Sequence, residues 1–186
     1  MRDDTPHSLF GAAAPPPRKA KNAKRVFEET LVTLTQLAGM VEAKPRTLQL
    51  WTDAKALEPL DGTDRKGSGA WRLYSRTECE LAAILVEAHK GFHLQAGVLA
   101  LLAQSLRRLE GDAARDDAFE RARRGTHAVW LVAVPEGDSY AVGFSTGAVL
   151  SLSALPGKDG IGLRDRPAIL VVNLTAALGK LGTSLT

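Results

Sequence analysis

An amphipathic pattern begins near residue 33. Thr33 and Gln36 have the spacing of a capping box. In this motif, at the start of a helix, the side chain of each residue accepts a hydrogen bond from the backbone N–H of the other. The apolar positions that follow recur every three or four residues, as one face of a helix requires. They are Leu34, Leu37, Ala38 and Val41.

A second helix is predicted from Pro45, because proline is tolerated in the first turn, where its missing N–H has no partner. Its expected buried positions, together with the segment that follows it, are Leu48, Trp51 and Leu57. Only a few residues separate the two helices, which is the spacing of a helix-turn-helix unit. Residues 61–69 are rich in Gly, Asp, Lys and Arg, and residues 71–74 alternate as a short strand, so we expect a loop and an edge ribbon that form a wing.

Two more helices and a connector are predicted downstream. Ser75 and Glu78 fit a second capping box, and the helix that they open ends at Gly91. Its expected buried side consists of Leu81, Ile84, Leu85 and Ala88. Apolar residues at helical spacing predict a further helix that runs to about Leu109. Residues 111–124 are nearly all charged or Ala, with Phe119 the only large apolar residue, and predict a solvated helical connector.

The pattern changes after Gly125. Residues 128–134 and 168–172 are continuous apolar runs, while Tyr140, Val142 and Phe144 alternate, which indicates strands, and Thr175 is suited to cap a short helix over 176–181. We therefore predict an α+β protein, whose helical half precedes a small strand-rich αβ domain. The expected division is a disordered basic arm over 1–30, a winged helix-turn-helix unit with its following helix over 31–110, a polar connector over 111–125 and the αβ domain over 126–186.

Composition adds limits to this picture. The 186 residues carry 24 basic and 21 acidic side chains, a net charge of +3, and the excess lies in residues 1–75, which is compatible with nucleic-acid binding. A lone cysteine, Cys79, excludes an internal disulfide and offers no thiolate cluster for zinc. No apolar run approaches the ~20 residues that span a bilayer, and residues 1–10 lack the order of a secretory signal, so we expect a soluble, cytoplasmic protein without membrane partners.

The order of helix, tight turn, helix, basic loop, aromatic strand, capped helix, Gly-Phe turn and helix resembles the winged-helix domain of the MerR family. The resemblance covers about Thr33 to Leu109 and rests on segments 33–38, 45–51, 57–59, 71–75 and 91–94. It implies sequence-specific binding of double-stranded DNA, with the start of the second helix in the major groove and the wing on the flanking backbone. The candidate DNA-binding residues are Lys44, Arg46, Thr47, Gln49, Trp51, Arg65, Lys66, Arg72 and Tyr74, although Trp51 and Tyr74 also suit a core.

The chain departs from the family at several positions. Gln49-Leu50-Trp51 stands where members usually carry Arg-Tyr-Tyr, Glu42 replaces a turn glycine, and Lys44 replaces a small polar cap. The polar stretch 111–125 offers no seam for the family's long coiled coil, so a dimer would form through residues 98–109 or the C-terminal domain. A metal sensor is not expected, because family metal sensors use several Cys ligands. His89 and His93 are separated by the helix break predicted at Gly91 and lack a third ligand nearby.

The predicted function is that of a transcriptional regulator with a C-terminal domain for dimerisation or effector sensing. Its expected partners are double-stranded DNA, a second copy of the chain, and an unidentified small-molecule or protein effector, with no cofactor. We expect no enzyme, since no nucleophile, base and orienting group stand at a recognisable spacing. Two alternatives remain at this stage: an excisionase-like protein that bends DNA, and an interaction adaptor without DNA binding, which the altered Gln49-Leu50 pair keeps open.

Overall fold

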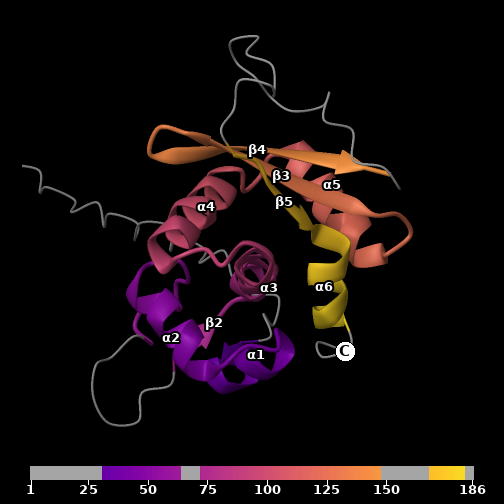
Figure 1. Ribbon diagram of the computed structural model, residues 1–186. Coiled ribbons are helices and arrows are strands. Elements are labelled where there is room, and N and C mark those ends of the chain that lie inside the picture. Colours follow the sequence, from indigo (N-terminus) through magenta and orange to yellow (C-terminus); the bar gives the residue numbers. More distant parts are fainter. Residues whose placement is uncertain (1–30, 64–71, 148–167, 183–186) are drawn as a thin grey trace, which may run out of the picture.

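A computed structural model describes residues 31–63, 72–147 and 168–182 (Figure 1). These residues form helices and two small antiparallel sheets, which confirms the predicted α+β class. None of the described helices is long and apolar enough to cross a membrane. The elements, in chain order, are β1 (Val32–Thr33), α1 (Leu34–Met40), α2 (Pro45–Asp53), β2 (Leu73–Tyr74), α3 (Arg76–Phe92), α4 (Ala96–Arg108), α5 (Ala113–Arg124), β3 (Val129–Glu136), β4 (Ser139–Thr146), β5 (Leu170–Asn173) and α6 (Leu174–Gly182).

The first two helices begin where the sequence predicts. Thr33 caps α1 in a capping box: the Gln36 N–H donates to Thr33 Oγ1 at 3.3 Å, and the Thr33 N–H donates to Gln36 Oε1 at 2.9 Å. Pro45 is the first residue of α2. In the turn between the helices, Glu42 has a φ of 53°, a left-handed conformation in which glycine would be less strained.

The short strand before α3 pairs with the two residues before α1, where the sequence predicts a helix cap at Thr33 but no strand. β2 is antiparallel to β1, with Val32 opposite Tyr74 and Thr33 opposite Leu73. The Leu60 N–H also donates to the Leu73 carbonyl at 2.8 Å, which closes the base of the predicted wing. The rest of that wing, residues 64–71, lies outside the described residues, as do the basic arm and residues 148–167.

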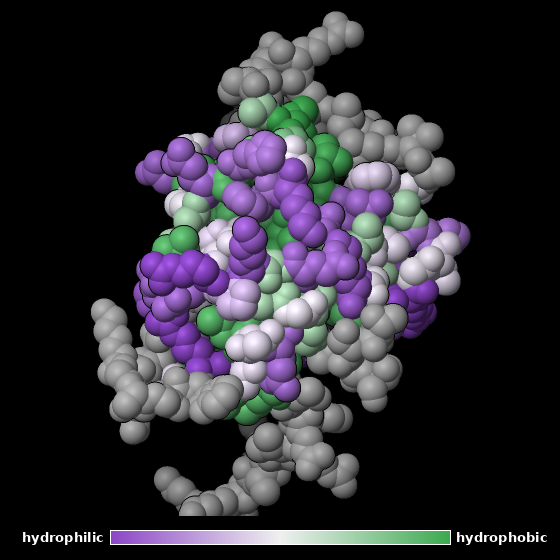
Figure 2. All heavy atoms as spheres, turned by 60° about the horizontal axis from the view of Figure 1, so that its bottom comes forward, coloured by the Kyte–Doolittle hydropathy of each residue, from purple (hydrophilic) through white to green (hydrophobic). Residues whose placement is uncertain are grey.

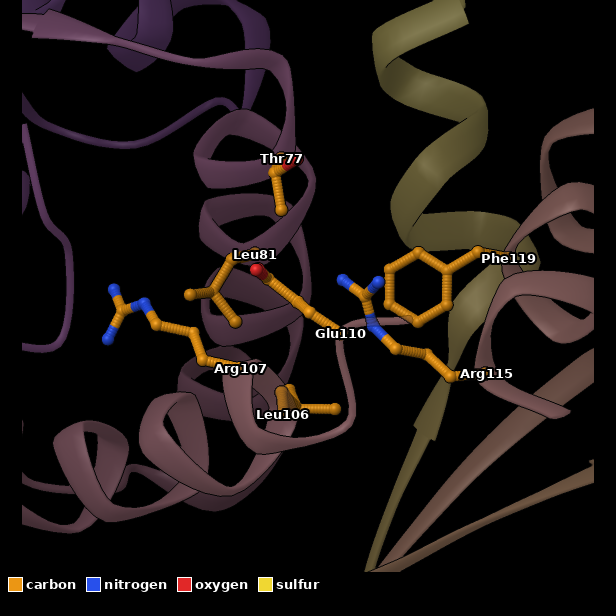
Figure 3. A pocket seen from close by; sticks show the side chains of 7 residues that line it. All are labelled: Thr77, Leu81, Leu106, Arg107, Glu110, Arg115 and Phe119. Atoms are coloured by element: carbon orange, nitrogen blue, oxygen red, sulfur yellow. The ribbon is translucent and has the colours of Figure 1, made fainter. Parts of the chain in front are cut away.

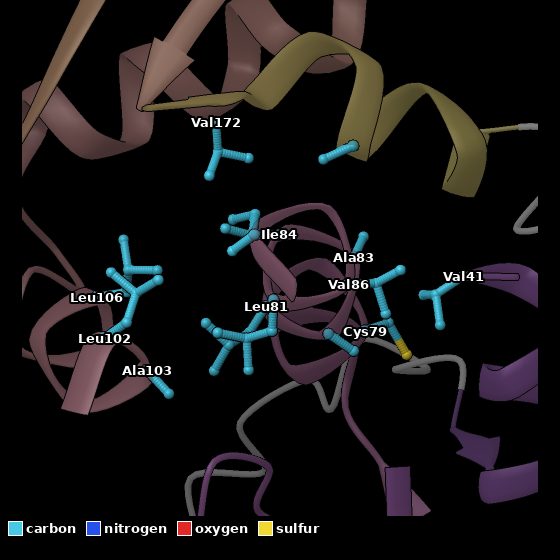
Figure 4. Packing of buried hydrophobic residues seen from close by; sticks show 14 of the residues in the cluster. Val41, Cys79, Leu81, Ala83, Ile84, Val86, Leu102, Ala103, Leu106 and Val172 are labelled. Atoms are coloured by element: carbon cyan, nitrogen blue, oxygen red, sulfur yellow. The ribbon is translucent and has the colours of Figure 1, made fainter. Parts of the chain in front are cut away.

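Helix α3 occupies the centre of the molecule. Ten of its 17 residues are buried, on more than one face, because neighbours surround it. In Figure 4, viewed nearly along α3, Leu81 and Ile84 point toward the α4 leucines, Val86 and Cys79 lie on the side of Val41, and Val172 lies beyond Ile84. The predicted buried side of α3 is confirmed, but burial extends beyond it to Cys79 and two glutamates.

The second sheet has the order β4-β3-β5 and is antiparallel throughout. Leu131 at its centre faces Phe144 of β4 and Val172 of β5, and all three belong to the core or pack against it. The helices lie below this sheet in Figure 1. The predicted cap of α6 is wrong: the helix begins at Leu174, and the Ala176 N–H donates to the Asn173 side chain at 2.9 Å.

One hydrophobic cluster contains residues from both sides of the predicted boundary near residue 125. α5 is helical, as expected, but one side of it is buried rather than solvated: Phe119 is 2% exposed, and its ring meets that of Phe144 edge to face at 6.0 Å. The apolar side of α4, with Leu99, Leu102 and Leu106 buried, is also used within the chain. It is therefore unavailable as the dimer seam that we considered for residues 98–109.

Candidate nucleic-acid interface

Helix α2 has one buried side and one solvent-facing side. Leu48, Trp51 and Thr52 are buried, whereas the opposite side carries residues at helical spacing that we call the outer stripe: Arg46, Gln49, Leu50 and Asp53. Figure 2 brings forward the side of the molecule on which α1 and α2 lie in Figure 1, and hydrophilic residues predominate there with small hydrophobic patches between them. The buried side fixes the helix, so the outer stripe is free to meet a ligand.

Two polar contacts organise the outer stripe. Arg46 Nη1 donates to Gln49 Oε1 at 3.0 Å, so the pair presents more N–H donors than acceptors. At the other end of α2, Arg72 Nη2 donates to Asp53 Oδ1 at 3.2 Å. Arg72 comes from the closing end of the predicted wing, and this contact ties the wing to α2.

Lys44 and Thr47 complete the start of α2. Lys44 is the N-cap residue, is exposed, and makes no side-chain hydrogen bond as a cap. Thr47 is partly buried. Lys44, Arg46, Thr47 and Gln49 therefore gather within the first five residues of α2 and its cap, the part of a recognition helix that enters the major groove in helix-turn-helix proteins.

The structure corrects two candidate contacts. Trp51 is 3% exposed, and its ring lies edge to face against His89, with centroids 5.5 Å apart. Tyr74 is fully buried, and its hydroxyl lies 2.9 Å from the Thr52 hydroxyl. Neither side chain is accessible to DNA; both hold α2 and β2 in place. Arg65 and Lys66 lie outside the described residues.

The residues that fix the segment after α2, Glu78 and Arg107, could not be recognised from the sequence pattern. Glu78, expected to complete a capping box, instead accepts two hydrogen bonds from Arg107 of α4, from Nε and Nη2, each at 2.9 Å. The Glu58 N–H donates to Glu78 Oε2 at 2.9 Å, and Arg107 Nη2 donates to the Ala56 carbonyl at 3.2 Å. The residues that leave α2 are thus anchored on α3 and α4. Of the predicted box, only the bond from the Glu78 N–H to Ser75 Oγ, at 3.2 Å, is present.

A second buried carboxylate binds α5 to α3. Glu80 accepts hydrogen bonds from Arg123 Nε and Nη2, each at 2.9 Å, and the bidentate geometry is typical of strong arginine-carboxylate pairs. Hydrogen bonding to Glu80 raises the pKa of Arg123. Between these two glutamates lies the Cys79 thiol, whose pKa is raised to about 12, first by burial and then by the two carboxylates. It is therefore a neutral core group rather than a reactive thiolate.

The C-terminal helix contacts the turn of the helix-turn-helix unit. Lys180 Nζ donates to Glu42 at 3.1 Å and to Glu87 of α3 at 2.9 Å, and Lys90 lies 3.7 Å from the same Glu42 carboxylate. The hydrogen bond from Lys180 lowers the pKa of Glu42. Glu42, which has a left-handed backbone where the resemblance leads us to expect glycine, is thus held by Lys180 of α6.

Two hollows are found among the described residues. A cavity between α3, α4 and α5 measures about 10 Å³, about the space of one water molecule (Figure 3). Arg115 extends beside Phe119 there, with the centre of its guanidinium 4.5 Å from the ring. A shallow groove of about 320 Å³ at the base of the predicted wing is lined by Glu58, Asp61, Glu110 and Arg107, among others. It is largely acidic.

Within the described ranges, no group of three or more His, Cys, Asp or Glu residues could hold a metal ion. His89 instead places Nδ1 2.9 Å from the Leu94 carbonyl. No known protein family matches the chain, and no curated protein is similar to it in sequence. The chemistry of the outer stripe therefore has to be interpreted from its own residues.

Proposed function

We propose that this protein is a sequence-specific transcriptional regulator of the MerR-like winged-helix type, which binds double-stranded DNA with the outer stripe of α2. The observation that carries the proposal is the two-sidedness of α2: its inner side is locked in the core, while Arg46 and Gln49 face solvent directly after a tight turn between two helices. Polar side chains on the solvent side are common to surface helices, so the support comes from their place on the second helix of a helix-turn-helix unit.

The chemistry of the stripe suits the major groove. Guanine presents two acceptors there, N7 and O6, and arginine is their most common partner. The donor-rich pair of Arg46 and Gln49 would read such a base edge, and Lys44 would neutralise a phosphate near the start of α2. Arg72, placed beside the end of α2 by Asp53, would bring the wing to the flanking backbone.

The C-terminal half would serve as support for this reader. α6 holds the turn before α2 through Lys180. α4, which precedes this half, holds the segment after α2 through Arg107. A role of this half in dimerisation or effector sensing stays a prediction. A dimer would bind pseudo-palindromic DNA, with the spacing of the two half-sites set by its symmetry.

Selection of randomised duplexes on the full-length protein tests the proposal. We expect one short motif to be enriched, and the affinity for a selected duplex to fall steeply between about 50 and 200 mM salt, as counterion release requires. The Arg46→Ala variant should lose preference for the motif. The matched control is Arg121→Ala, which removes an exposed arginine of α5 that pairs with Asp117; it should bind like the wild type.

Three outcomes oppose the proposal. A folded protein that enriches no duplex is not a DNA-binding protein, and the adaptor alternative gains. Enrichment of flexible or bent duplexes without a base motif indicates an excisionase-like architectural protein. Equal losses in Arg46→Ala and Arg121→Ala indicate attraction by overall charge rather than recognition by α2.

A further inference from the structure

We propose that Leu50 reads sequence by packing against the C5-methyl group of a thymine in the major groove; this inference rests on the proposed DNA-binding function. Leu50 is 49% exposed, and the other large hydrophobic residues that the described ranges leave similarly exposed are Leu31 and Phe92, which lie outside α2. Leu50 alone among these three stands on the outer stripe.

The position of Leu50 places it among the residues of α2 that are proposed to contact DNA. It comes four residues after Arg46 and directly after Gln49, so the polar groups that would face base edges surround it on the same side of α2. The two α2 residues that flank the pair, Leu48 and Trp51, are buried on the opposite side. About half of the Leu50 surface stays in water, and contact with an apolar group would remove part of that surface from water.

The major groove offers one apolar group on the base edges, the thymine methyl. The approach of Leu50 to it is not opposed by charge, because Asp53, the acidic residue of the outer stripe, is paired with Arg72 at 3.2 Å. Arg46 and Gln49 would contact a guanine, and Leu50 beside them would contact a thymine. We therefore expect the recognised sequence to contain a thymine close to a guanine.

Replacement of thymine by deoxyuridine tests this contact, because uracil lacks only the methyl group. Each thymine of a selected duplex is replaced in turn, and the affinities of the full-length wild type and the Leu50→Ala variant are measured at constant salt. At one thymine we expect the wild type to bind about three- to fivefold more weakly after replacement, the value of roughly one buried methyl group. Leu50→Ala should bind the thymine duplex more weakly and no longer distinguish thymine from uracil there.

Two controls define the result. Leu31→Ala removes another exposed leucine outside α2 and should keep the full thymine preference, and Leu50→Met should keep most of it because its side chain stays apolar. If wild type and Leu50→Ala lose affinity equally on replacement at every thymine, or neither does, the inference is wrong. If Leu50→Ala leaves every duplex affinity unchanged, Leu50 serves another contact, such as one with a protein. If no duplex binds the wild type at all, the proposed function itself fails.

Discussion

On the outer stripe of α2, Arg46 is exposed and its hydrogen-bond partner, Gln49, belongs to the same helix. At the junction of α3 with its neighbours, Arg107 and Arg123 each bind both oxygens of a buried glutamate from a different helix. The same residue type is thus exposed in one region and paired with a buried carboxylate of another helix in the other.

This difference separates the residues proposed to contact DNA from those that hold the fold. A buried carboxylate without its arginine is strongly unfavourable, because it has lost water without gaining a partner. An exposed arginine can be removed with little effect on stability, since surface contacts contribute on the order of 0–1 kcal/mol. Substitutions in the two regions should therefore affect different measurements: unfolding for the junction and DNA binding for the outer stripe.

The largest expected effect follows from removal of the C-terminal half. A fragment that ends at Gly125 lacks β3, β4, β5 and α6. Of these, β5 and α6 pack on α3, so their removal exposes core residues such as Ile84. We expect this fragment to show no cooperative thermal transition by circular dichroism, whereas the full chain does. A fragment that unfolds cooperatively near the midpoint of the full chain would mean that the two halves are independent, and the comparison above would lose its basis.

Removal of Arg107 should be the most destabilising single change at the junction. Arg107→Met leaves Glu78 buried and unpaired, and we expect the free energy of unfolding in urea to fall by about 3–5 kcal/mol. The double variant Glu78→Gln with Arg107→Met should recover much of this loss, because a neutral amide oxygen can still accept the Glu58 N–H. A double variant as unstable as the single one would show that the packing of Arg107, rather than its charge, matters.

Changes at Arg46 and Gln49 of the outer stripe should alter DNA binding with little change in stability, and a change at Arg72, the partner of Asp53, should also weaken binding. Arg46→Ala and Gln49→Ala are each expected to reduce discrimination against a wrong base by about 1–3 kcal/mol at the base that they read. Arg72→Ala should weaken all duplexes about equally and reduce the slope of log affinity against log salt by about 1. Titration of matched and mismatched duplexes at several salt concentrations measures both; unchanged discrimination in Arg46→Ala and Gln49→Ala assigns them to positioning roles.

The contact between α6 and the turn should give the smallest effect, and one that depends on pH. The pKa of Glu42 is lowered in the folded state, so its contribution to stability is present above its ordinary value of 4.5 and is lost as pH falls through the lowered value. Lys180→Gln should therefore shift the urea midpoint slightly at neutral pH and less in acid. Arg108→Gln, at the exposed end of α4, serves as the control. An equal shift at both pH values would contradict the ion pair as its cause.

Local patterns in the sequence were enough for most of the secondary structure. The Thr33 cap, the proline at the start of α2 and the three C-terminal strands depend on neighbours within a few residues, and all are confirmed. Side chains that serve distant partners were misassigned for the same reason. Glu78 has capping-box spacing but binds Arg107, 29 residues away, and Thr175 resembles a cap but contacts His127 and Val129.

The candidate site could be predicted only in part. Lys44, Arg46 and Gln49 lie on or beside the solvent-facing start of α2, as the helical period indicates. Trp51 and Tyr74 were candidates for both roles, because an aromatic residue satisfies the pattern of a core and of a DNA contact equally well. Their burial confirms the core role, and the Thr52 and His89 contacts show how they pack. Composition does not indicate that Leu50 is exposed. Its exposure follows from the orientation of α2 about its own axis, which turns Leu48 and Trp51 toward the core and Leu50 toward solvent.

The contact between Lys180 and Glu42 joins residues 138 positions apart, and this separation bears on how the protein is made. While the chain emerges from the ribosome, α1, α2 and α3 are complete long before residues 170–182 exist. Until then α3 lacks the cover of β5 and α6, so its apolar residues are open to solvent or to other nascent chains. The helix-turn-helix unit is thus translated early, but its contacts are completed late, when α6 has been added.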